Sequence, residues 1–271
     1  MVNVTIEMVK KLRKRTGAGM MNCKKALIEA NGNIDVAIDY MRKKGDTQSA
    51  AKRLDYPASE GIIMIKIDEN CAAMIEINCE TDFVSQNATF KNFADRIISS
   101  AVYDRIKDIE IIRSKFKEEQ LALMNAVGEN IYIRRISVIE VEDKNEISYY
   151  LHRSRIGVIV TTTCQSRNKE LGKHIAMHIA ASKPEYIKTE LIPINIVERE
   201  REIQKAIAIK SGKSPNILEK IIDGRIKKYF DELTLVCQKF IFEPTKTVAQ
   251  VLKENNTQVI TFTRFSLGES E

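Results

Sequence analysis

Two stretches of this sequence share one order of hydrophobic patterns, a strand hairpin followed by an amphipathic helix. In the first stretch, residues 61–67 and 72–78 are rich in Ile and Met and flank the turn Asp68-Glu69-Asn70. This pattern predicts two antiparallel strands. A helix is predicted next, because apolar residues then recur on one face of a 3.6-residue period. These residues are Phe90, Phe93, Ala94, Ile97, Ile98 and Ala101.

The second stretch repeats this order further along the chain. Strands are expected over residues 131–141, 147–152 and 156–163, and a helix follows them. The apolar face of that helix is marked by Leu171, Ile175, His178 and Ile179. The repetition predicts an α+β fold with a core of two related subdomains, each containing an antiparallel sheet.

The first 45 residues predict three short helices. In the first helix, the residues that repeat at helical spacing are Ile6, Val9 and Leu12. The segment Thr16–Gly19 then interrupts the helix. Asn22 is expected to cap a second helix that runs through Ala30, with Asn31-Gly32 closing it. Asn33 is expected to cap the third helix.

These three helices are expected to form a small bundle at the N-terminus. The inner face of the third helix consists of Ala37, Tyr40 and Met41. Because so small a unit buries little apolar surface, we expect the bundle to move somewhat independently of the rest. The helical pattern ends before residues 46–60, where Pro57 and small polar residues predict a linker.

Residues 193–232 are strongly helical and charged. Their two apolar stripes consist of Ile196, Ile203 and Ile207, and of Ile217, Leu218, Ile221 and Ile222. The segment Ser211–Pro215 joins the stripes and supplies a glycine after one helix, then a capping serine and a proline at the start of the next. An antiparallel helical hairpin is therefore predicted.

The end of the chain predicts a strand over 238–243, a helix over 247–255 and a strand over 258–267. Strands this late must pair with strands already formed, so the hairpin is expected to be an insertion. The predicted domains are a bundle with its linker (1–55), an α+β core (56–181 with 233–271) and the inserted hairpin (182–232).

Composition indicates a soluble globular chain, since 44% of the 271 residues are apolar and 30% are charged. The five cysteines form no C-x-x-C pair, so reduced thiols fit better than a disulfide framework. No apolar stretch approaches the roughly 20 residues that span a bilayer. We therefore expect a cytoplasmic protein without a membrane segment.

Motifs for nucleotide, metal and covalent chemistry are incomplete. Gly212-Lys213-Ser214 resembles the end of a phosphate-binding loop, but Ile207 stands where that loop requires glycine and Pro215 follows directly. His174 and His178 share one helical face, yet no Cys or carboxylate cluster completes a metal site with them. The sequence also lacks a context for a catalytic Ser or Cys. An enzyme of unknown type stays an alternative only if a pocket gathers titratable groups.

Basic clusters occur at residues 10–15, 24–25 and 42–44, in a chain of formal net charge +6. A solvated helix face is the reading we favour, against contact with RNA or with an acidic helix. No aromatic residue lies among these charges and the chain has no Trp, so surfaces for base stacking are scarce. Direct nucleic-acid binding is not expected, and an RNA-binding accessory protein is kept as an alternative.

One segment, Glu80–Val84, is expected to lie between a strand and a helix, where loops present functional groups. Phe83 within it has two interpretations. An exposed Phe beside Asp82 would be an anchor for an interaction, whereas most Phe side chains pack into a core. The residues themselves favour neither interpretation.

Four segments closely resemble motifs of the bacterial elongation factor Ts family. Leu12–Leu27 is similar to the N-terminal signature of that family, and Asn78–Val84 to its second signature. The remaining matches are Gly128–Asn130 with Arg134-Arg135, and His174–Pro184. The resemblance extends over residues 3–268.

This resemblance implies a fold and a function. The implied fold is a ubiquitin-associated-like N-terminal bundle, a core of two related subdomains and an inserted helical hairpin used for dimerisation. The implied partner is elongation factor Tu, the GTPase that delivers aminoacyl-tRNA, in its GDP-bound and nucleotide-free states. The implied activity is guanine-nucleotide exchange, in which Mg²⁺ is displaced and GDP leaves so that GTP can bind. This activity requires no catalytic residue, metal or cofactor of the exchange factor.

The resemblance also implies contact residues. Asp82 and Phe83, with Thr81 and Val84, would enter the GTPase domain and disturb its Mg²⁺ site. The N-terminal contact would consist of Met20, Met21 and Lys24. Further contact positions are Val127, His152 and Ile241, although the sequence around His152 departs from the family pattern. Many relatives continue with another partner-binding helix after the last strand, and we expect that contact to be missing here.

Overall fold

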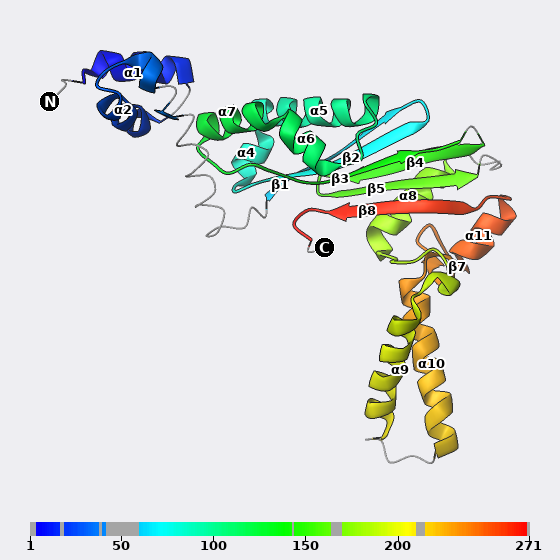
Figure 1. Cartoon of the computed structure of the whole chain (residues 1–271). Helices are drawn as coiled ribbons and strands as arrows, with labels where there is room; N and C mark the ends of the chain where they lie inside the picture. The colour runs from blue at the N-terminus through cyan, green and yellow to red at the C-terminus, as the bar shows by residue number, and fades with distance from the viewer. Residues whose placement is uncertain are drawn as a thin grey trace. The chain divides into compact units, whose positions relative to one another are not determined.

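A computed structural model of the chain (Figure 1) describes residues 4–16, 19–37, 40–41, 60–142, 144–163, 170–209 and 215–269. Its helices and antiparallel sheets confirm the α+β class. The chain divides into two compact units. The first comprises residues 1–140, 151–157 and 265–271, and the second comprises residues 141–150 and 158–264.

The N-terminal segment contains helices α1 (Ile6–Thr16) and α2 (Met20–Glu29). Asn22 lies inside α2, because the N-cap is Gly19, so the predicted start of this helix was wrong. Asn33 does cap a further helical turn, since its Oδ1 accepts the backbone N–H groups of Asp35 and Val36 at 3.0 and 3.2 Å. The buried cluster of this segment comprises Val9, Leu12, Cys23, Ala26, Leu27, Ala30 and Ala37. Nearly all of the predicted linker lies outside the described residues.

The first sheet has the strand order β1-β2-β3, with both pairs antiparallel. Its strands are β1 (Glu60–Asp68), β2 (Cys71–Cys79) and β3 (Tyr132–Glu140). The predicted grouping of the third strand with the downstream stretch is corrected, because β3 pairs with β2. Hydrophobic patterns identify strands but do not specify their partners.

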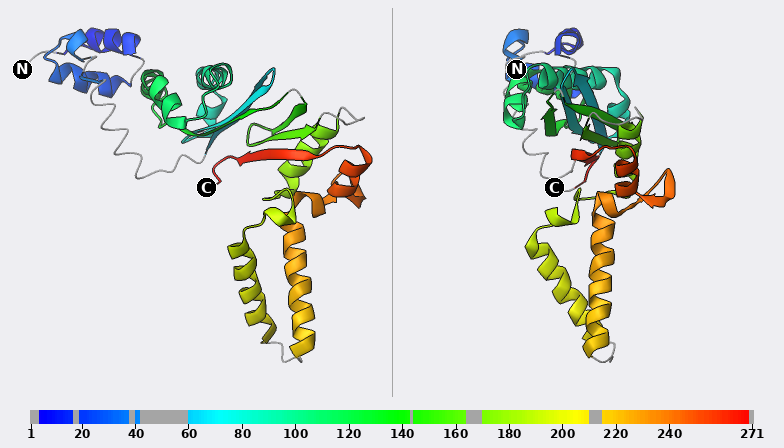
Figure 2. Two further views of the ribbon diagram at one scale, coloured as in Figure 1. Left: turned by 45° about the vertical axis from the view of Figure 1, so that its right-hand side comes forward. Right: turned by 90° about the vertical axis from the view of Figure 1, so that its right-hand side faces the viewer.

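Helices α5 (Ala88–Tyr103), α6 (Ile109–Lys115) and α7 (Lys117–Val127) lie on one face of this sheet, as Figures 1 and 2 show. The predicted apolar face of α5 is confirmed, since all six of its named residues are buried in one cluster with residues of β2. Helices α6 and α7 were not predicted from the sequence. The short helix α4 (Asp82–Gln86) stands between β2 and α5.

The second sheet has the order β4-β5-β8, from strands β4 (Asn145–His152), β5 (Ile156–Thr163) and β8 (Val259–Ser266). The late strand β8 therefore pairs with an earlier strand, as predicted. Helix α8 (Leu171–Ser182) approaches β4 closely at Gly172, where a Cβ atom would lie 2.2 Å from Ser148 Oγ. Each sheet thus carries a strand hairpin followed in the chain by a long helix, which agrees with the predicted repetition.

Helices α9 (Ile194–Ile209) and α10 (Pro215–Leu233) form the predicted antiparallel hairpin and lie side by side in Figures 1 and 2. The ion pair Arg201–Asp223, at 3.1 Å, joins them. Pro215 is the first residue of α10, as predicted, and residues 211–214 lie outside the described part. The 3₁₀ turns η1 (Thr189–Leu191) and η2 (Leu235–Cys237) flank the hairpin in the chain.

The segment after the hairpin differs from the prediction. The single strand expected over 238–243 is a pair of short strands, β6 (Lys239–Phe240) and β7 (Glu243–Thr247), in a separate two-stranded sheet. Helix α11 (Val248–Glu254) follows as predicted, and a capping box between Thr247 and Gln250 fixes its start. None of the described helices is long and apolar enough to cross a membrane.

Candidate functional site

Phe83 lies on the surface of the first unit. Its exposed fraction is 84%, the highest among the large hydrophobic residues that the structure describes, whereas Phe90 and Phe93 are at most 1% exposed. Leaving a large aromatic side chain in water forgoes about 1.5–3 kcal/mol of burial free energy. The question that the sequence left open is thereby answered, because Phe83 is exposed and does not belong to the core.

The first turn of α4 presents Phe83. Thr81 is the N-cap of this helix, and its Oγ1 accepts the backbone N–H of Val84 at 3.4 Å. Asp82 is exposed at the first helical position, where a carboxylate is favourable because of the helix dipole. Val84 and Ser85 are buried and hold the opposite side of the turn against the protein. The expected loop is therefore a helix start that directs two neighbouring side chains outward.

Two carboxylates attach this turn to the segment after α7. Glu129 accepts hydrogen bonds from Thr81 N at 3.0 Å and from Thr81 Oγ1 at 2.6 Å. Glu80 accepts hydrogen bonds from Asn130 N at 3.0 Å and from Asn130 Nδ2 at 2.6 Å. We call these four residues the clasp. Hydrogen bonds to ionised groups are roughly twice as strong as neutral ones, so the clasp fixes the backbone just before Phe83.

A buried thiol forms a hydrogen bond to the backbone of the α4 turn. Cys79, the last residue of β2, donates a hydrogen bond from Sγ to the carbonyl of Thr81 at 3.1 Å. Burial, together with the carboxylates of Glu129 and Glu60, raises the pKa of the Cys79 thiol to about 12. The thiol is therefore protonated at neutral pH and available as a donor.

Val127 lies next to the clasp in the chain. It is half-buried and packs against the hydrophobic cluster that also contains Val84. Gly128 ends α7 in the left-handed conformation, with φ of 80°, and so turns the chain toward Glu129. The structure thus brings Val127 and Val84 of α4 into one hydrophobic cluster of the first unit.

Comparison with known proteins identifies the family that carries this site. A family model described as Elongation factor TS matches residues 80–269, which include the clasp and Phe83. The chain is 49% identical over 271 residues to proteins named Elongation factor Ts from Yersinia pestis (strain Pestoides F) and from Yersinia pseudotuberculosis serotype O:1b (strain IP 31758). Each alignment covers 99% of this chain and 93% of the relative.

The chain belongs to the elongation factor Ts family. The resemblance predicted from the motifs is therefore confirmed, and the chain is a translation elongation factor. The matched segment begins at Glu80, one of the two carboxylates of the clasp.

In this member of the elongation factor Ts family, the predicted N-terminal contact residues lie on one helix. Met20 and Met21 on α2 are 37% and 63% exposed, and Lys24 is exposed as well. The other side of α2 is buried through Cys23 and Leu27. Flexible Met side chains beside a cation form an adaptable surface that suits binding to another protein.

His152 and Ile241, the remaining predicted contacts, belong to different units of this elongation factor Ts family member. His152 ends β4 and is exposed, and its carbonyl accepts the N–H of Arg155 at 2.9 Å. Ile241 is 40% exposed between β6 and β7, and its N–H donates to His178 Nδ1 at 3.4 Å. Whether either residue contacts a partner stays a prediction.

The two histidines of α8 have aromatic partners. His178 is buried, its Nε2 lies 2.9 Å from Gln238 Oε1, and its ring centroid lies 5.8 Å from that of Phe240. Burial lowers the pKa of His178 despite the hydrogen bond to Gln238. The ring of His174 lies 4.5 Å from that of Phe242. Among the described residues, no group of three or more His, Cys, Asp or Glu could hold a metal ion.

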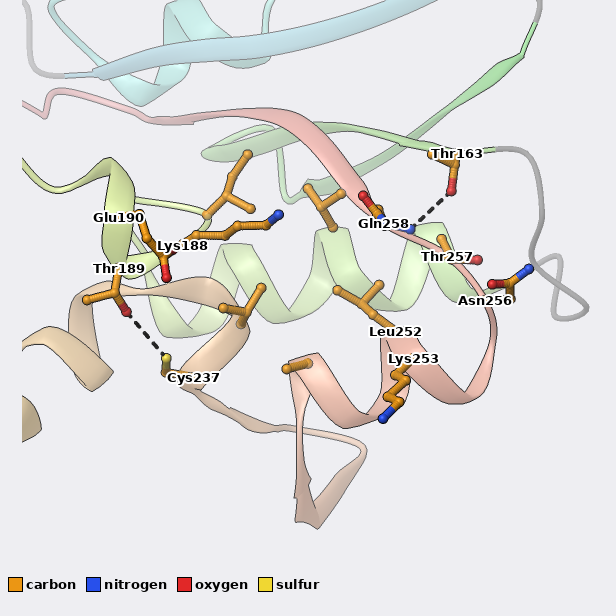
Figure 3. Close-up of a pocket in the computed structure, with 14 residues that line it drawn as sticks. Thr163, Lys188, Thr189, Glu190, Cys237, Leu252, Lys253, Asn256, Thr257 and Gln258 are labelled. Carbon is orange, nitrogen blue, oxygen red and sulfur yellow. Dashed lines mark hydrogen bonds between the residues drawn. The ribbon is translucent and has the colours of Figure 1, made fainter.

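The second unit contains a cavity of about 660 Å³, the kind of pocket that an enzyme of unknown type would need (Figure 3). Its wall mixes apolar side chains such as Leu252 with Lys188, Glu190 and Cys237. Thr189 Oγ1 lies 3.8 Å from Cys237 Sγ. Burial raises the pKa of the Cys237 thiol, which makes it a poor nucleophile at neutral pH.

The roles of Glu76 and of the two clasp carboxylates were not predicted from the sequence. The side chain of Glu76 is completely buried in β2 and accepts hydrogen bonds from Arg134, Arg135, Asn78 and the N–H of Gly268. A β-bulge explains the double arginine, because Glu76 pairs with Arg135 and Ile77 with Ile133, which leaves Arg134 as the extra residue. The available signal was the family motif containing Glu129 and Arg134-Arg135.

Proposed function

We propose that this protein is a guanine-nucleotide exchange factor for elongation factor Tu, and that it acts in the cytoplasm by binding alone, without bond-making chemistry. One observation carries the proposal: Phe83 is 84% exposed on a helix start that hydrogen bonds hold in place. Family membership supplies the translation context, and the family resemblance implies the partner.

The energetics require a factor that prefers the open state of its partner. A GTPase that holds GDP with nanomolar affinity has a binding free energy of about −12 kcal/mol, so spontaneous release is slow. Exchange becomes faster only if the factor binds the nucleotide-free or distorted state better than the loaded state. By linkage, nucleotide weakens the factor by the same ratio.

The α4 turn suits such a preference. A buried aromatic anchor commonly contributes about 2 kcal/mol or more to an interface. If Phe83 inserts only into the distorted partner, that free energy favours the open state. Asp82, exposed beside it, would compete for or reorient groups around Mg²⁺, which bridges the phosphates and supplies much of their electrostatic hold.

A surface on α2 would contribute affinity. Met20, Met21 and Lys24 are exposed together on a helix of the N-terminal segment. We propose that they contact a part of elongation factor Tu away from the nucleotide. Contacts of equal strength in the loaded and open states tighten the complex without shifting the equilibrium. Val127, His152 and Ile241 are proposed as further contacts.

The proposal is tested by the release of fluorescent GDP from elongation factor Tu. We expect the full chain to accelerate release, with saturation as its concentration increases. Ile111→Ala serves as a matched control for substitutions of Phe83, because Ile111 is also a large exposed hydrophobic residue, 54% exposed, on the first unit. Release that is no faster with the chain than without it would refute the proposal.

A further inference from the structure

The Phe83 turn depends on support from outside its own helix. Helix α4 has five residues, and so short a helix is not stable in water by itself. Strand β2 ends at Cys79, so the N–H of Thr81 has no partner in the sheet. Glu129 supplies that partner and binds the Thr81 hydroxyl with its other oxygen. One side chain from beyond α7 thus holds both donors of the residue that caps α4.

The hydroxyl of Thr81 connects Glu129 to the helix. A hydroxyl has one proton and two acceptor positions, and a carboxylate can only accept. The proton of Thr81 Oγ1 is therefore directed to Glu129 Oε1 at 2.6 Å, which leaves a lone pair for the N–H of Val84 at 3.4 Å. The carboxylate thereby orients the cap, and the cap orients the turn that carries Phe83.

Glu80 strengthens this arrangement from the opposite direction. It extends from the segment of Thr81 to Asn130 and binds both the backbone N–H and the side-chain amide of that residue. Each segment therefore supplies one carboxylate that accepts hydrogen bonds from the other segment. Reciprocal attachment resists both sliding and rotation of the α4 segment, because each segment both accepts and donates.

We infer that Glu129 is a positioning residue for nucleotide exchange, which holds Phe83 in the orientation that the distorted partner accepts. The inference assumes the proposed function. A side chain presented on an immobilised backbone loses less conformational entropy on binding than one on a mobile loop. Glu129 would therefore act on the maximal rate of GDP release through Phe83, without touching the partner's nucleotide.

Glu129→Gln is the most direct test. An amide side chain has one acceptor oxygen in place of two, so one of the two Thr81 donors loses its partner. We expect the GDP release rate at saturating factor to fall about tenfold, the size of a lost preorganisation contribution. The concentration for half-saturation should change less, because the α2 surface is intact. The control is Glu119→Gln on α7, which removes one charge from the exposed ion pair between Glu119 and Arg96 of α5.

The double variant Phe83→Ala/Glu129→Gln separates positioning from a general structural role. If Glu129 acts through Phe83, the double variant releases GDP at the rate of Phe83→Ala alone. A further decrease equal to that of Glu129→Gln alone would show an independent role and overturn the inference. A wild-type rate for Glu129→Gln would also overturn it. A wild-type rate for Phe83→Ala is a different result, because it contradicts the proposed function itself.

Thr81 provides a second route if Glu129→Gln does not fold. Thr81→Ser keeps the hydroxyl and should retain most of the wild-type exchange rate. Thr81→Val removes the hydroxyl and should lower the rate as much as Glu129→Gln does. Urea unfolding of each variant establishes that the chain is folded at the assay temperature. Equal exchange rates for Thr81→Ser and Thr81→Val would show that the hydroxyl does not orient the turn, and would overturn the inference.

Discussion

Glu76, completely buried in strand β2, accepts a hydrogen bond of 2.7 Å from Nε of Arg135. The same guanidinium lies 4.2 Å from the centroid of the Phe265 ring and donates to the carbonyl of Ser266 at 3.0 Å. Glu76 itself accepts the N–H of Gly268 at 2.9 Å. One buried carboxylate therefore ties β2, β3 and the C-terminal segment of the first unit together.

We expect Glu76→Ala to destabilise the protein by about 3–5 kcal/mol, because it leaves the Arg135 and Arg134 charges without their buried partner. Urea unfolding, followed by a signal from the first unit, measures this change. Glu119→Ala, which breaks an exposed pair, should have little effect. Equal unfolding midpoints for the two variants would contradict the role assigned to Glu76.

Stability should depend on pH through His178. Burial lowers the pKa of His178 below its ordinary value of 6.5, so the unfolded chain binds a proton that the folded state resists. The contribution of neutral His178 to the free energy of unfolding is therefore fully present above pH 6.5 and is lost as the pH falls below that value. Urea unfolding at about pH 7.5 and about pH 5 should show this loss, and it should be smaller in His178→Gln. An identical pH dependence in both proteins would contradict the assignment.

Met20→Asp and Lys24→Glu should weaken binding to elongation factor Tu, with the release rate at saturating factor largely unchanged. Both residues are exposed on α2, and contacts of equal strength in both partner states do not bias the equilibrium. Titration of factor against fluorescent-GDP release separates the two quantities. A large loss of the saturated rate would show that the α2 surface acts directly on the nucleotide site.

The helical hairpin is expected to mediate self-association. Ile203 on α9 is 44% exposed, and an exposed apolar side chain of this kind is stabilised when a second copy covers it. Ile203→Asp should weaken the dimer by about 1–2 kcal/mol, as measured by analytical ultracentrifugation. Its unfolding free energy should stay within about 0.5 kcal/mol of the wild type, because the residue is on the surface. Unchanged self-association in Ile203→Asp would show that Ile203 is not part of the dimer contact.

Periodicity in the sequence predicted the elements better than it predicted their partners. The apolar face of α5 and the Asn33 cap were correct, because both depend on residues that lie close together in the chain. The predicted grouping of residues 131–141 with the downstream strands was wrong, because this strand, β3, pairs with β2. A strand pattern does not specify the partner, which only the tertiary structure decides. Helices α6 and α7 were not assigned at all.

The candidate site was predictable in part. The family motif pointed to Asp82 and Phe83, but the exposure of Phe83 could not be derived, since Phe occurs in cores and at interfaces alike. The partnership of Thr81 with Glu129 spans 48 residues, and no local pattern specifies such a distance. The bulge that directs both Arg134 and Arg135 to Glu76 was equally invisible, because it reverses the alternation that a regular strand would have.

Phe83 and Asp82 are proposed to act on the partner and not on the fold of this chain. Phe83→Ala should change the free energy of unfolding by no more than about 0.5 kcal/mol, whereas a core Phe would lose about 3–5 kcal/mol. Asp82→Ala should also leave the fold intact. The effects of the two substitutions on exchange should be non-additive, because the residues are adjacent.

The most direct test is the rate of labelled GDP release from elongation factor Tu at saturating concentrations of the Asp82→Ala/Phe83→Ala double variant, with urea unfolding measured in parallel. We expect a folded double variant that binds elongation factor Tu through the remaining contacts, with GDP release clearly slower than with the wild type and Ile111→Ala unaffected. A wild-type rate of release in the double variant would contradict this expectation.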